Sequence, residues 1–288
     1  MNQPQMCEEV PLLYRLLLIV LLFNSLTACS SVAQNTVNFS ILSELPLPAE
    51  LRETSALYCP EDGSAYTVND SGNKPIIYQL DDSGNLQSSL PINIKNKDWE
   101  SLTGDKKHFY IGDVGNNNGK RKFVQIHTVD KQDLGQVKNT IRLHYLDNSI
   151  KGNEYLNHDF DSESIVSMGQ QLYLFSKSWR TNNLYIYRLE KDVLEQKIRP
   201  FQSIEGLPDI VTGGDYDAKN KRFILLGYEL KGLGRFYPFV AILNQDFKLV
   251  KSFLLDRFKQ VEGLCVTPKG DVWITQEGAF SPLRNWSK

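Results

Sequence analysis

Residues 100–120 read ESLTGDKKHFYIGDVGNNNGK, and this stretch contains the pattern that decides the fold. An acidic residue opens a short apolar run, a polar turn follows, and His-Phe-Tyr-Ile forms a second run at 108–111. A loop of Gly, Asp and three Asn comes next. Short runs rich in aromatic and β-branched residues, bounded by turn residues, favour strands. The stretch therefore predicts two strands, with a carboxylate before the first and a polar loop after the second.

The same arrangement recurs along the chain. The acidic residues that open the other repeats are Glu53, Glu163, Asp215 and Glu262. A third strand-like run follows four of the repeats, at 75–81, 123–130, 184–190 and 239–245. A fourth run follows each of these, at 87–94, 139–147, 197–204 and 249–256. Four strands and about 50 residues per repeat are typical of a β-propeller blade.

The two ends of the chain complete the count of blades. The last repeat has two clear strands and a short third run at 283–287, but no clear fourth strand. Residues 36–46 form an orphan strand-like run that can supply it, which would remove an exposed sheet edge. We therefore expect an all-β fold: a β-propeller of five four-stranded blades over 36–288, closed by the N-terminal strand. Six blades remain the alternative, if 100–162 or 190–215 contains another.

The N-terminal segment is separate from these repeats. Residues 12–23 are apolar apart from Tyr14 and Arg15, and LTAC follows at 26–29. This order is typical of a secretory signal, and Leu-Thr-Ala-Cys resembles the lipobox of bacterial lipoproteins. The resemblance implies a signal peptide over 1–28, a lipid on Cys29, a tether over 29–35 and attachment to a membrane. Ser30 after the cysteine implies delivery to the outer membrane. An uncleaved anchor, or an ordinary signal with a chance cysteine, remains the alternative.

The net charge and the cysteines bear on two further questions, nucleic-acid binding and disulfide formation. The net charge is −2, so we expect no nucleic-acid partner, which would need a basic face. Cys59 and Cys265 are the two cysteines within the repeats. An exported protein can form a disulfide between them, but we expect buried, small apolar residues.

The repeated carboxylates are the main functional signal. The first strand of a propeller blade lies nearest the axis, and the loops before it and after the second strand emerge on one face. Glu53, Glu100, Glu163, Asp215 and Glu262 are therefore expected around one mouth of the channel, with Asn69, Asp70, Asp113 and Asn116 from the loops. Carboxylates and amides suit Ca²⁺ better than zinc. The alternatives are that each acid caps backbone N–H groups of a neighbouring blade, or that one acid transfers protons.

Two tryptophans lie near the expected mouth. Trp99 precedes Glu100 and is expected to pack between blades. Trp179 and Arg180 lie in the third polar loop, where they could form a platform for a sugar or an aromatic ligand.

Two motifs resemble a known group of proteins. Residues 69–80 read N-D-x-G-N-x-P-x-I-Y-x-L, and Glu-(Ser/Gly)-(Leu/Ile) opens several repeats. Together they resemble the SdiA-regulated and esterase-like phytase families of secreted bacterial propellers. The resemblance implies Ca²⁺ in the central channel. The positions that match such a role are Glu53, Glu100, Glu163, Glu262, Asn69, Asp70, Asp113 and Asn116. The fourth repeat departs from the pattern, with Gly214-Asp215 in place of Glu-Ser.

Three functions remain open from the sequence, one of which is purely structural: surface scaffolding in a protein complex. The first is a lipid-anchored protein of the cell envelope that binds a small-molecule ligand or a protein partner through an acidic, Ca²⁺-binding mouth. The second is a Ca²⁺-dependent hydrolase of a phosphoester, ester or lactone, with a ring carboxylate as base. Cations in the expected mouth loops are few, which favours binding; they are Lys74, Lys120, Arg121 and Arg180.

Overall fold

The computed structural model describes residues 39–41, 45–133, 135–232, 234–255, 258–276 and 279–285. All of them belong to one compact unit over residues 38–288. The predicted signal peptide (1–28), Cys29 and the tether (29–35) lie outside the described residues. Among the described residues, no helix is long and apolar enough to cross a membrane.

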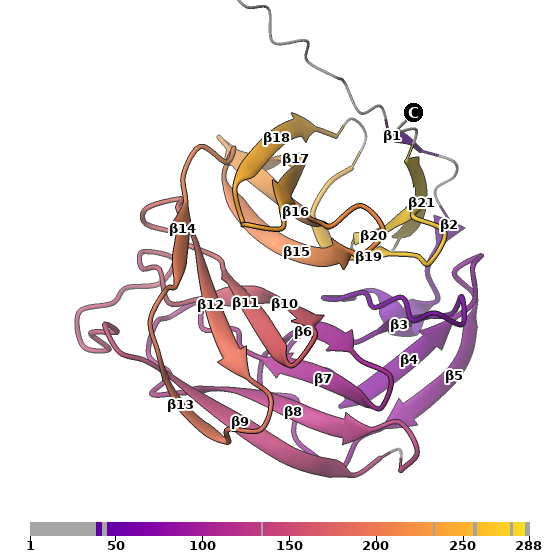
Figure 1. The fold of residues 1–288 in the computed structure, drawn as a ribbon, viewed down its shortest axis with the longest axis horizontal. Helices are drawn as coiled ribbons and strands as arrows, with labels where there is room; N and C mark the ends of the chain where they lie inside the picture. The colour runs from indigo at the N-terminus through magenta and orange to yellow at the C-terminus, as the bar shows by residue number, and fades with distance from the viewer. Residues whose placement is uncertain are drawn as a thin grey trace, which may run out of the picture. The chain divides into compact units, whose positions relative to one another are not determined.

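The described strands form five sheets around a common centre (Figure 1). Sheet 1 contains β3 (Ala65–Thr67), β4 (Ile76–Leu80) and β5 (Leu86–Pro91). Sheet 2 contains β6 (Trp99–Gly104), β7 (His108–Asp113), β8 (Val124–Asp130), β9 (Val137–Tyr145) and β13 (Glu195–Ile198). Sheet 3 contains β10 (Ser162–Met168), β11 (Gln171–Ser176), β12 (Leu184–Glu190) and β14 (Gln202–Ile204).

Sheets 4 and 5 complete the ring. Sheet 4 contains β15 (Ile210–Asp217), β16 (Arg222–Lys231), β17 (Arg235–Asn244) and β18 (Leu249–Leu254). Sheet 5 contains β19 (Val261–Val266), β20 (Val272–Gln276), β21 (Ala279–Asn285), β1 (Phe39–Ile41) and β2 (Leu45–Pro46). The helical content of the described part is one 3-10 turn, η1 (Ala49–Leu51). The fold is an all-β propeller, as the repeats predict.

The innermost strands touch one another in sequence order. β6 contacts β10, β10 contacts β15, and β15 contacts β19. In sheet 1 the innermost segment, residues 54–58, forms isolated bridges to β3 and its extension instead of a continuous strand. The hydroxyl of Ser55 donates to the carbonyl of Trp99 at 2.8 Å, which connects this segment to β6. Sheet 1 therefore has three strands and a fourth, irregular inner segment, where the repeat predicts four strands.

A disulfide joins the first and last sheets. Cys59 and Cys265 are bonded to each other, with their Cα atoms 5.5 Å apart, and both are buried. The backbone of Gly263 also packs closely on the segment 54–58, because a Cβ at Gly263 would lie 2.7 Å from the carbonyl carbon of Ala56. The prediction of two unpaired, buried cysteines is wrong. The bond closes the ring between segments that are 206 residues apart in the sequence.

The N-terminal strand adds to the last sheet, as predicted. β1 pairs antiparallel with β21, so that Phe39 faces Asn285. The connection after β12 differs from the prediction, because its fourth strand is divided into two. β13 crosses to sheet 2 and pairs parallel with β9, whereas β14 pairs with β12. Residues 190–215 thus contain a strap between two sheets and not a further sheet.

The hydrophobic core lies between neighbouring sheets, because each strand alternates its apolar side chains toward the two sheets beside it. Phe175 and Phe223 fill the space between sheets 3 and 4, and Ile77 and Trp99 fill that between sheets 1 and 2. Trp99 is fully buried at 0% exposure, which confirms its predicted packing role.

Candidate functional site

The inner strands share a backbone irregularity that positions the site. A β-bulge interrupts β6 between Trp99 and Ser101, and equivalent bulges interrupt β10, β15 and β19. A bulge leaves one extra residue unpaired and re-aims its side chain. The residues at the four bulges are Glu100, Glu163, Thr212 and Glu262, and all four line one cavity at the centre of the ring. The cavity has a volume of about 10 Å³, enough for about one water molecule.

Glu53 does not join this ring, although the repeat predicts that it does. Thr54, next to it, is buried and forms the bridge to Asn69, while Ser55 lines the central cavity. The Glu53 side chain is exposed and accepts a hydrogen bond from Nδ2 of Asn73 at 2.6 Å. The prediction aligned the repeats by their acids. In the inner segment of sheet 1, Ser55 takes the place that Glu100 takes in sheet 2, so the cavity-lining position comes two residues after Glu53.

Asp215 is also outside the ring, because Thr212 occupies the bulge of β15. The hydroxyl of Thr212 donates to the carbonyl of Val261 at 2.8 Å. The Asp215 carboxylate accepts the backbone N–H of Val266 in the next sheet at 2.8 Å, and that of Tyr216 at 2.7 Å. Asp215 therefore fits the alternative interpretation, a structural connection between neighbouring sheets. Between sheets 2 and 3 a serine hydroxyl makes the corresponding connection: Ser101 Oγ accepts the backbone N–H of Ile165 at 2.8 Å.

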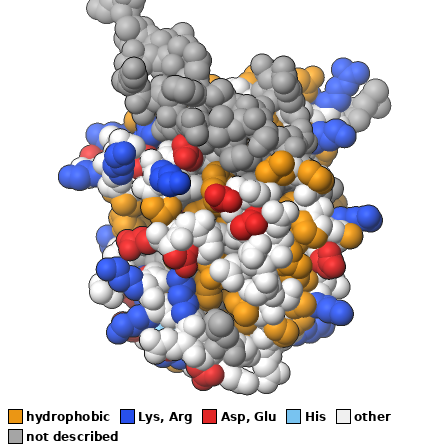
Figure 2. Space-filling model, turned by 90° about the vertical axis from the view of Figure 1, so that its right-hand side faces the viewer, with side chains coloured by type: hydrophobic (Ala, Val, Ile, Leu, Met, Phe, Trp, Pro, Cys, Tyr) orange, Lys and Arg blue, Asp and Glu red, His pale blue; other side chains and the backbone are white. Residues whose placement is uncertain are grey.

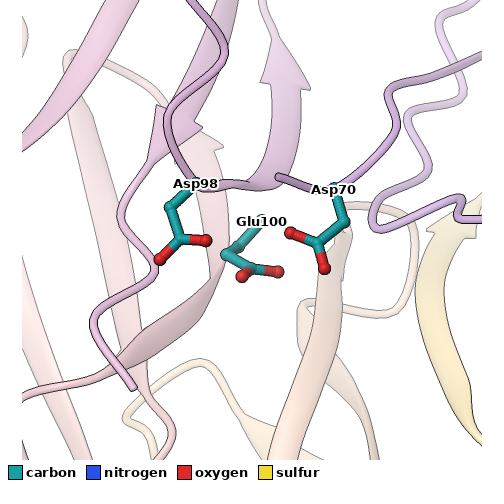
Figure 3. Close-up of side chains that lie close together, drawn as sticks. All are labelled: Asp70, Asp98 and Glu100. Carbon is teal, nitrogen blue, oxygen red and sulfur yellow. The ribbon is translucent and has the colours of Figure 1, made fainter. Parts of the chain in front are cut away.

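Three carboxylates crowd together at the mouth, between sheets 1 and 2 (Figure 3). One oxygen from each of Asp70, Asp98 and Glu100 lies within 4.8 Å of the others. Trp99 is buried in the core, so its neighbours Asp98 and Glu100 are directed away from it toward the mouth. We call these three residues the carboxylate trio. Asp98 was missed in the sequence, although its place beside a buried tryptophan, two residues before Glu100, is a usable signal.

Asn96 holds the two loops of the trio together. Its Nδ2 donates to the carbonyl oxygens of Asn69 at 3.0 Å and Asp70 at 2.8 Å. Its Oδ1 accepts the backbone N–H of Trp99 at 3.1 Å. One buried amide thereby connects the loop after β3 to the start of β6. Asn69 itself donates to the carbonyl of Glu50 at 2.6 Å, while its buried Oδ1 has no hydrogen-bond partner.

The trio lies in an unfavourable electrostatic environment. Burial, and then the negative charges of Asp70 and Asp161, raise the pKa of Asp98 to about 6. Burial raises the pKa of Asp70. Burial and the Glu163 carboxylate raise the pKa of Glu100 well above its usual value. Each shift has the direction expected when desolvated carboxylates repel one another.

The described cations compensate this charge only in part, because Arg121 lowers the pKa of Asp98, and Lys177 that of Glu100, by less than burial and neighbouring acids raise them. Within the described part of the chain, no hydrogen bond reaches the side chains of Asp98 or Glu100. The backbone of Gly115 packs against both, since a Cβ there would lie 2.5 Å from Asp98 Oδ2 and 2.7 Å from Glu100 Oε1. Glu163 is also buried, and its Oε2 has no hydrogen-bond partner. The chemistry of these donors, hard anionic oxygens in a small space, fits a divalent cation such as Ca²⁺.

One lysine of the mouth balances part of the charge. Lys177 is buried, and its ammonium group forms an ion pair with Oε1 of Glu163. Burial opposes the charge of this lysine, but the Glu163 carboxylate holds the pKa of Lys177 well above its usual value. The ammonium group also lies 4.9 Å from the ring centroid of Trp179. Trp179 donates its indole N–H to Asp161 at 2.9 Å, so this tryptophan is part of the mouth wall.

The other predicted ligands have structural partners. Asp113 lies 2.6 Å from Arg121 Nη2 and 3.7 Å from His127 Nε2. Although burial opposes it, His127 and Arg121 hold the pKa of Asp113 below its usual value. Asn116 donates its side-chain amide to the carbonyl of Phe160 at 2.8 Å and accepts the N–H of Arg121 at 3.0 Å. Of the predicted residues, Asp70 and Glu100 belong to the trio, and Glu163 and Glu262 line the central cavity with Glu100.

Comparisons with known proteins add no function. The chain matches no family model and no curated protein sequence. Similar solved structures include one of the mitotic checkpoint complex, at 8% identity and a TM-score of 0.44, covering 87% of this chain and 97% of that one. The WD40 propeller domain of Doa1 has 8% identity and a TM-score of 0.45, covering 82% and 79%. Streptogramin B lyase has 11% identity and a TM-score of 0.44, covering 86% and 98%. Sequence identities and TM-scores this low identify neither a family nor an activity. The resemblance to the SdiA-regulated and esterase-like phytase families therefore stays a prediction.

Proposed function

We propose that this protein is a five-bladed, lipid-anchored propeller of the cell envelope that binds a divalent cation, Ca²⁺, at its mouth and uses that mouth to bind a ligand or a protein partner. The observation that carries the proposal is the carboxylate trio. Three crowded carboxylates, two of them without a described hydrogen bond, are costly unless a cation compensates them.

The trio and Glu163 are the residues that would hold the cation. Asp70, Asp98 and Glu100 supply three carboxylates, and the partnerless Oε2 of Glu163 supplies a fourth oxygen. Ca²⁺ accepts six to eight oxygen ligands in flexible geometry, whereas Mg²⁺ demands a near-ideal octahedron. A site built mainly from carboxylates therefore favours Ca²⁺. Lys177 forms its ion pair with Glu163 and reaches Glu100 and Asp70 only through space, so the trio keeps net negative charge for the cation.

The anchoring part of the proposal rests on the sequence. The LTAC motif supports a lipid on Cys29 and attachment to a membrane, and Ser30 supports the outer membrane. Labelled palmitate, supplied to cells that produce the protein, should be retained by the wild type and lost from Cys29→Ala. Equal labelling of the two proteins would contradict the lipid anchor.

The cation site is tested by calcium binding. We expect the purified protein to bind one equivalent of Ca²⁺ by calorimetric titration, and Asp98→Asn and Glu100→Gln each to lower the affinity at least about tenfold. The matched control is Asp82→Asn, which removes one carboxylate from an exposed turn between β4 and β5. Unchanged affinity in both trio variants would refute the site.

A second candidate function is a cation-dependent hydrolase of a phosphoester, ester or lactone. One observation favours it: a cleft of about 600 Å³ has Asp98 on its wall, and this volume is within the usual range for small-molecule sites. A bound cation can polarise a carbonyl or phosphoryl oxygen. Chromogenic esters, lactones and phosphoesters should be tested with Ca²⁺ and with a chelator. Turnover that is abolished in Glu100→Gln would favour the hydrolase.

A further inference from the structure

The cleft beside Asp98 is formed by three loops on the mouth side of sheet 2. They are the segment before β6, the loop between β7 and β8, and the loop between β9 and β10. Its volume is about 600 Å³, room for two or three sugar rings or a comparable small molecule. We propose that this cleft binds an acidic oligosaccharide, a short chain of sugars that carry carboxylates. The proposal does not depend on the cation site.

Positive charge is the first feature of the cleft. Four cations and one acid line it, in a chain whose net charge is −2. The face that Figure 2 shows carries both acidic and basic side chains. The four cations are Lys97, Lys120, Arg121 and Lys122. A cleft with this balance attracts anions.

Two of these cations are available for a ligand. Lys120 donates to the carbonyl oxygens of Ile150 and Asn153, and Arg121 is paired with Asp113. Lys97 and Lys122, in contrast, are exposed and make no ion pair or side-chain hydrogen bond with any described residue. Their ammonium groups can therefore pair with carboxylates of a bound chain.

Aromatic and amide groups are the second feature. Tyr155 lines the cleft with 66% of its surface exposed, and the half-buried Phe123 also lines it. Large exposed aromatic side chains offer apolar ring faces on which the C–H faces of sugars stack. Asn117 and Asn118 also line the cleft, and an asparagine amide carries both donors and an acceptor, which suit sugar hydroxyls. A small inorganic anion would need the lysines but neither ring.

The cleft is also rigid, because buried polar groups connect its loops. Asn153 donates from Nδ2 to the carbonyl of Gly119 at 2.8 Å, and Nε2 of His158 lies 3.0 Å from the carbonyl of Asn117. The N–H of Leu156 also donates to the carbonyl of Asn117 at 3.0 Å. Asn153 and His158 are both buried. A preformed wall lowers the entropy cost of ordering the loops on binding. The same hydrogen bonds give residues 151–164, which include the loop between β9 and β10, a structural role.

The test is a binding measurement with trigalacturonate, an acidic trisaccharide, on the full protein. We expect calorimetric titration to detect binding, and a neutral galactose trisaccharide to bind at least about tenfold more weakly. The variant Lys97→Ala/Lys122→Ala should lose about tenfold or more in affinity, and Tyr155→Ala several-fold. The matched control, Lys106→Ala/Lys269→Ala, removes two exposed lysines from turns of other strands and should bind normally.

Several outcomes would overturn the proposal. Equal binding of the neutral trisaccharide, or full affinity in Lys97→Ala/Lys122→Ala, would show that the lysines do not select an acidic sugar. Inorganic phosphate that binds as tightly as trigalacturonate, with no effect of Tyr155→Ala, would exclude a saccharide site. A chelator and Glu100→Gln separate this proposal from the cation site: trigalacturonate binding that survives both supports the cleft even if Ca²⁺ binding fails.

Discussion

The disulfide between Cys59 and Cys265 allows a quantitative prediction about the ring. Replacing both cysteines with alanine removes the covalent closure and keeps both positions apolar, as their cluster with Leu57 and Trp273 requires. Serine would instead bury a hydroxyl group. The double substitution releases a loop of 206 residues in the unfolded chain.

The size of the effect follows from this loop length. A cross-link across 206 residues lowers the entropy of the unfolded chain by an amount worth about 5 kcal/mol at room temperature. Disulfides usually stabilise proteins by somewhat less than the loop entropy alone gives. We therefore expect Cys59→Ala/Cys265→Ala to lower the free energy of unfolding by about 3–5 kcal/mol, and the melting temperature by about 10 °C. Urea unfolding followed by fluorescence measures the first quantity, and thermal scanning the second.

Reduction of the wild type is the internal control. A reductant should shift the wild type to the stability of the double variant and leave the double variant unchanged. Either single variant should match the double variant. The reasoning is refuted if wild type and double variant unfold at the same urea concentration, or if thiol titration of the unfolded, unreduced protein finds Cys59 and Cys265 free.

Three further predictions concern the mouth and its surroundings. Lys177→Met leaves the buried Glu163 without its cation, so we expect the free energy of unfolding in urea to fall by about 3 kcal/mol. The double variant Lys177→Met/Glu163→Gln should lose less stability. An equal loss in the two variants would contradict the ion pair. Burial raises the pKa of Asp215 from 3.8 to about 6, so the folded protein binds more protons than the unfolded chain between these values. The charged carboxylate therefore destabilises the fold, an effect that is absent below pH 3.8 and complete above about pH 6. Asp215→Asn should reduce the fall in stability across that window by about 3 kcal/mol. Parallel stability profiles of the variant and the wild type would contradict this prediction. Gly115→Ala places a methyl group against two carboxylates of the trio and should lower Ca²⁺ affinity about tenfold, whereas Gly152→Ala, with no atom closer than 3.5 Å, should not.

The strands were predictable because their pattern is local. The run at 108–111 became β7, and the apolar runs at 75–81 and 239–245 became β4 and β17. Aromatic and β-branched residues in short alternating runs carry this information within a few residues. The division of 197–204 into β13 and β14 was not predictable. Ile198 pairs with sheet 2 and Gln202 with sheet 3, and both short runs have the composition of ordinary strands.

The site was predictable only in part, because it depends on register and on distant contacts. Glu100 and Glu163 were identified, but Glu53 and Asp215 were placed in the ring by the position of an acid in each repeat. The bulges decide which residue enters the ring, and no residue type at these positions marks a bulge. The partnership of Cys59 with Cys265 likewise depends on ring closure, which two lone cysteines do not reveal.

The difference between the repeat and the site explains why the fold does not by itself define a function. The bulge supplies the same backbone device in four inner strands, yet its side chain is Glu in β6, β10 and β19 and Thr in β15. Charge is therefore unevenly distributed around the ring. The trio forms where the loop after β3 meets the start of β6, since Asn96 connects them there. The cleft with the free lysines opens beside the same junction. The chemistry thus depends on loops that are specific to sheets 1 and 2, so exchanging these loops should move ligand binding without changing the propeller.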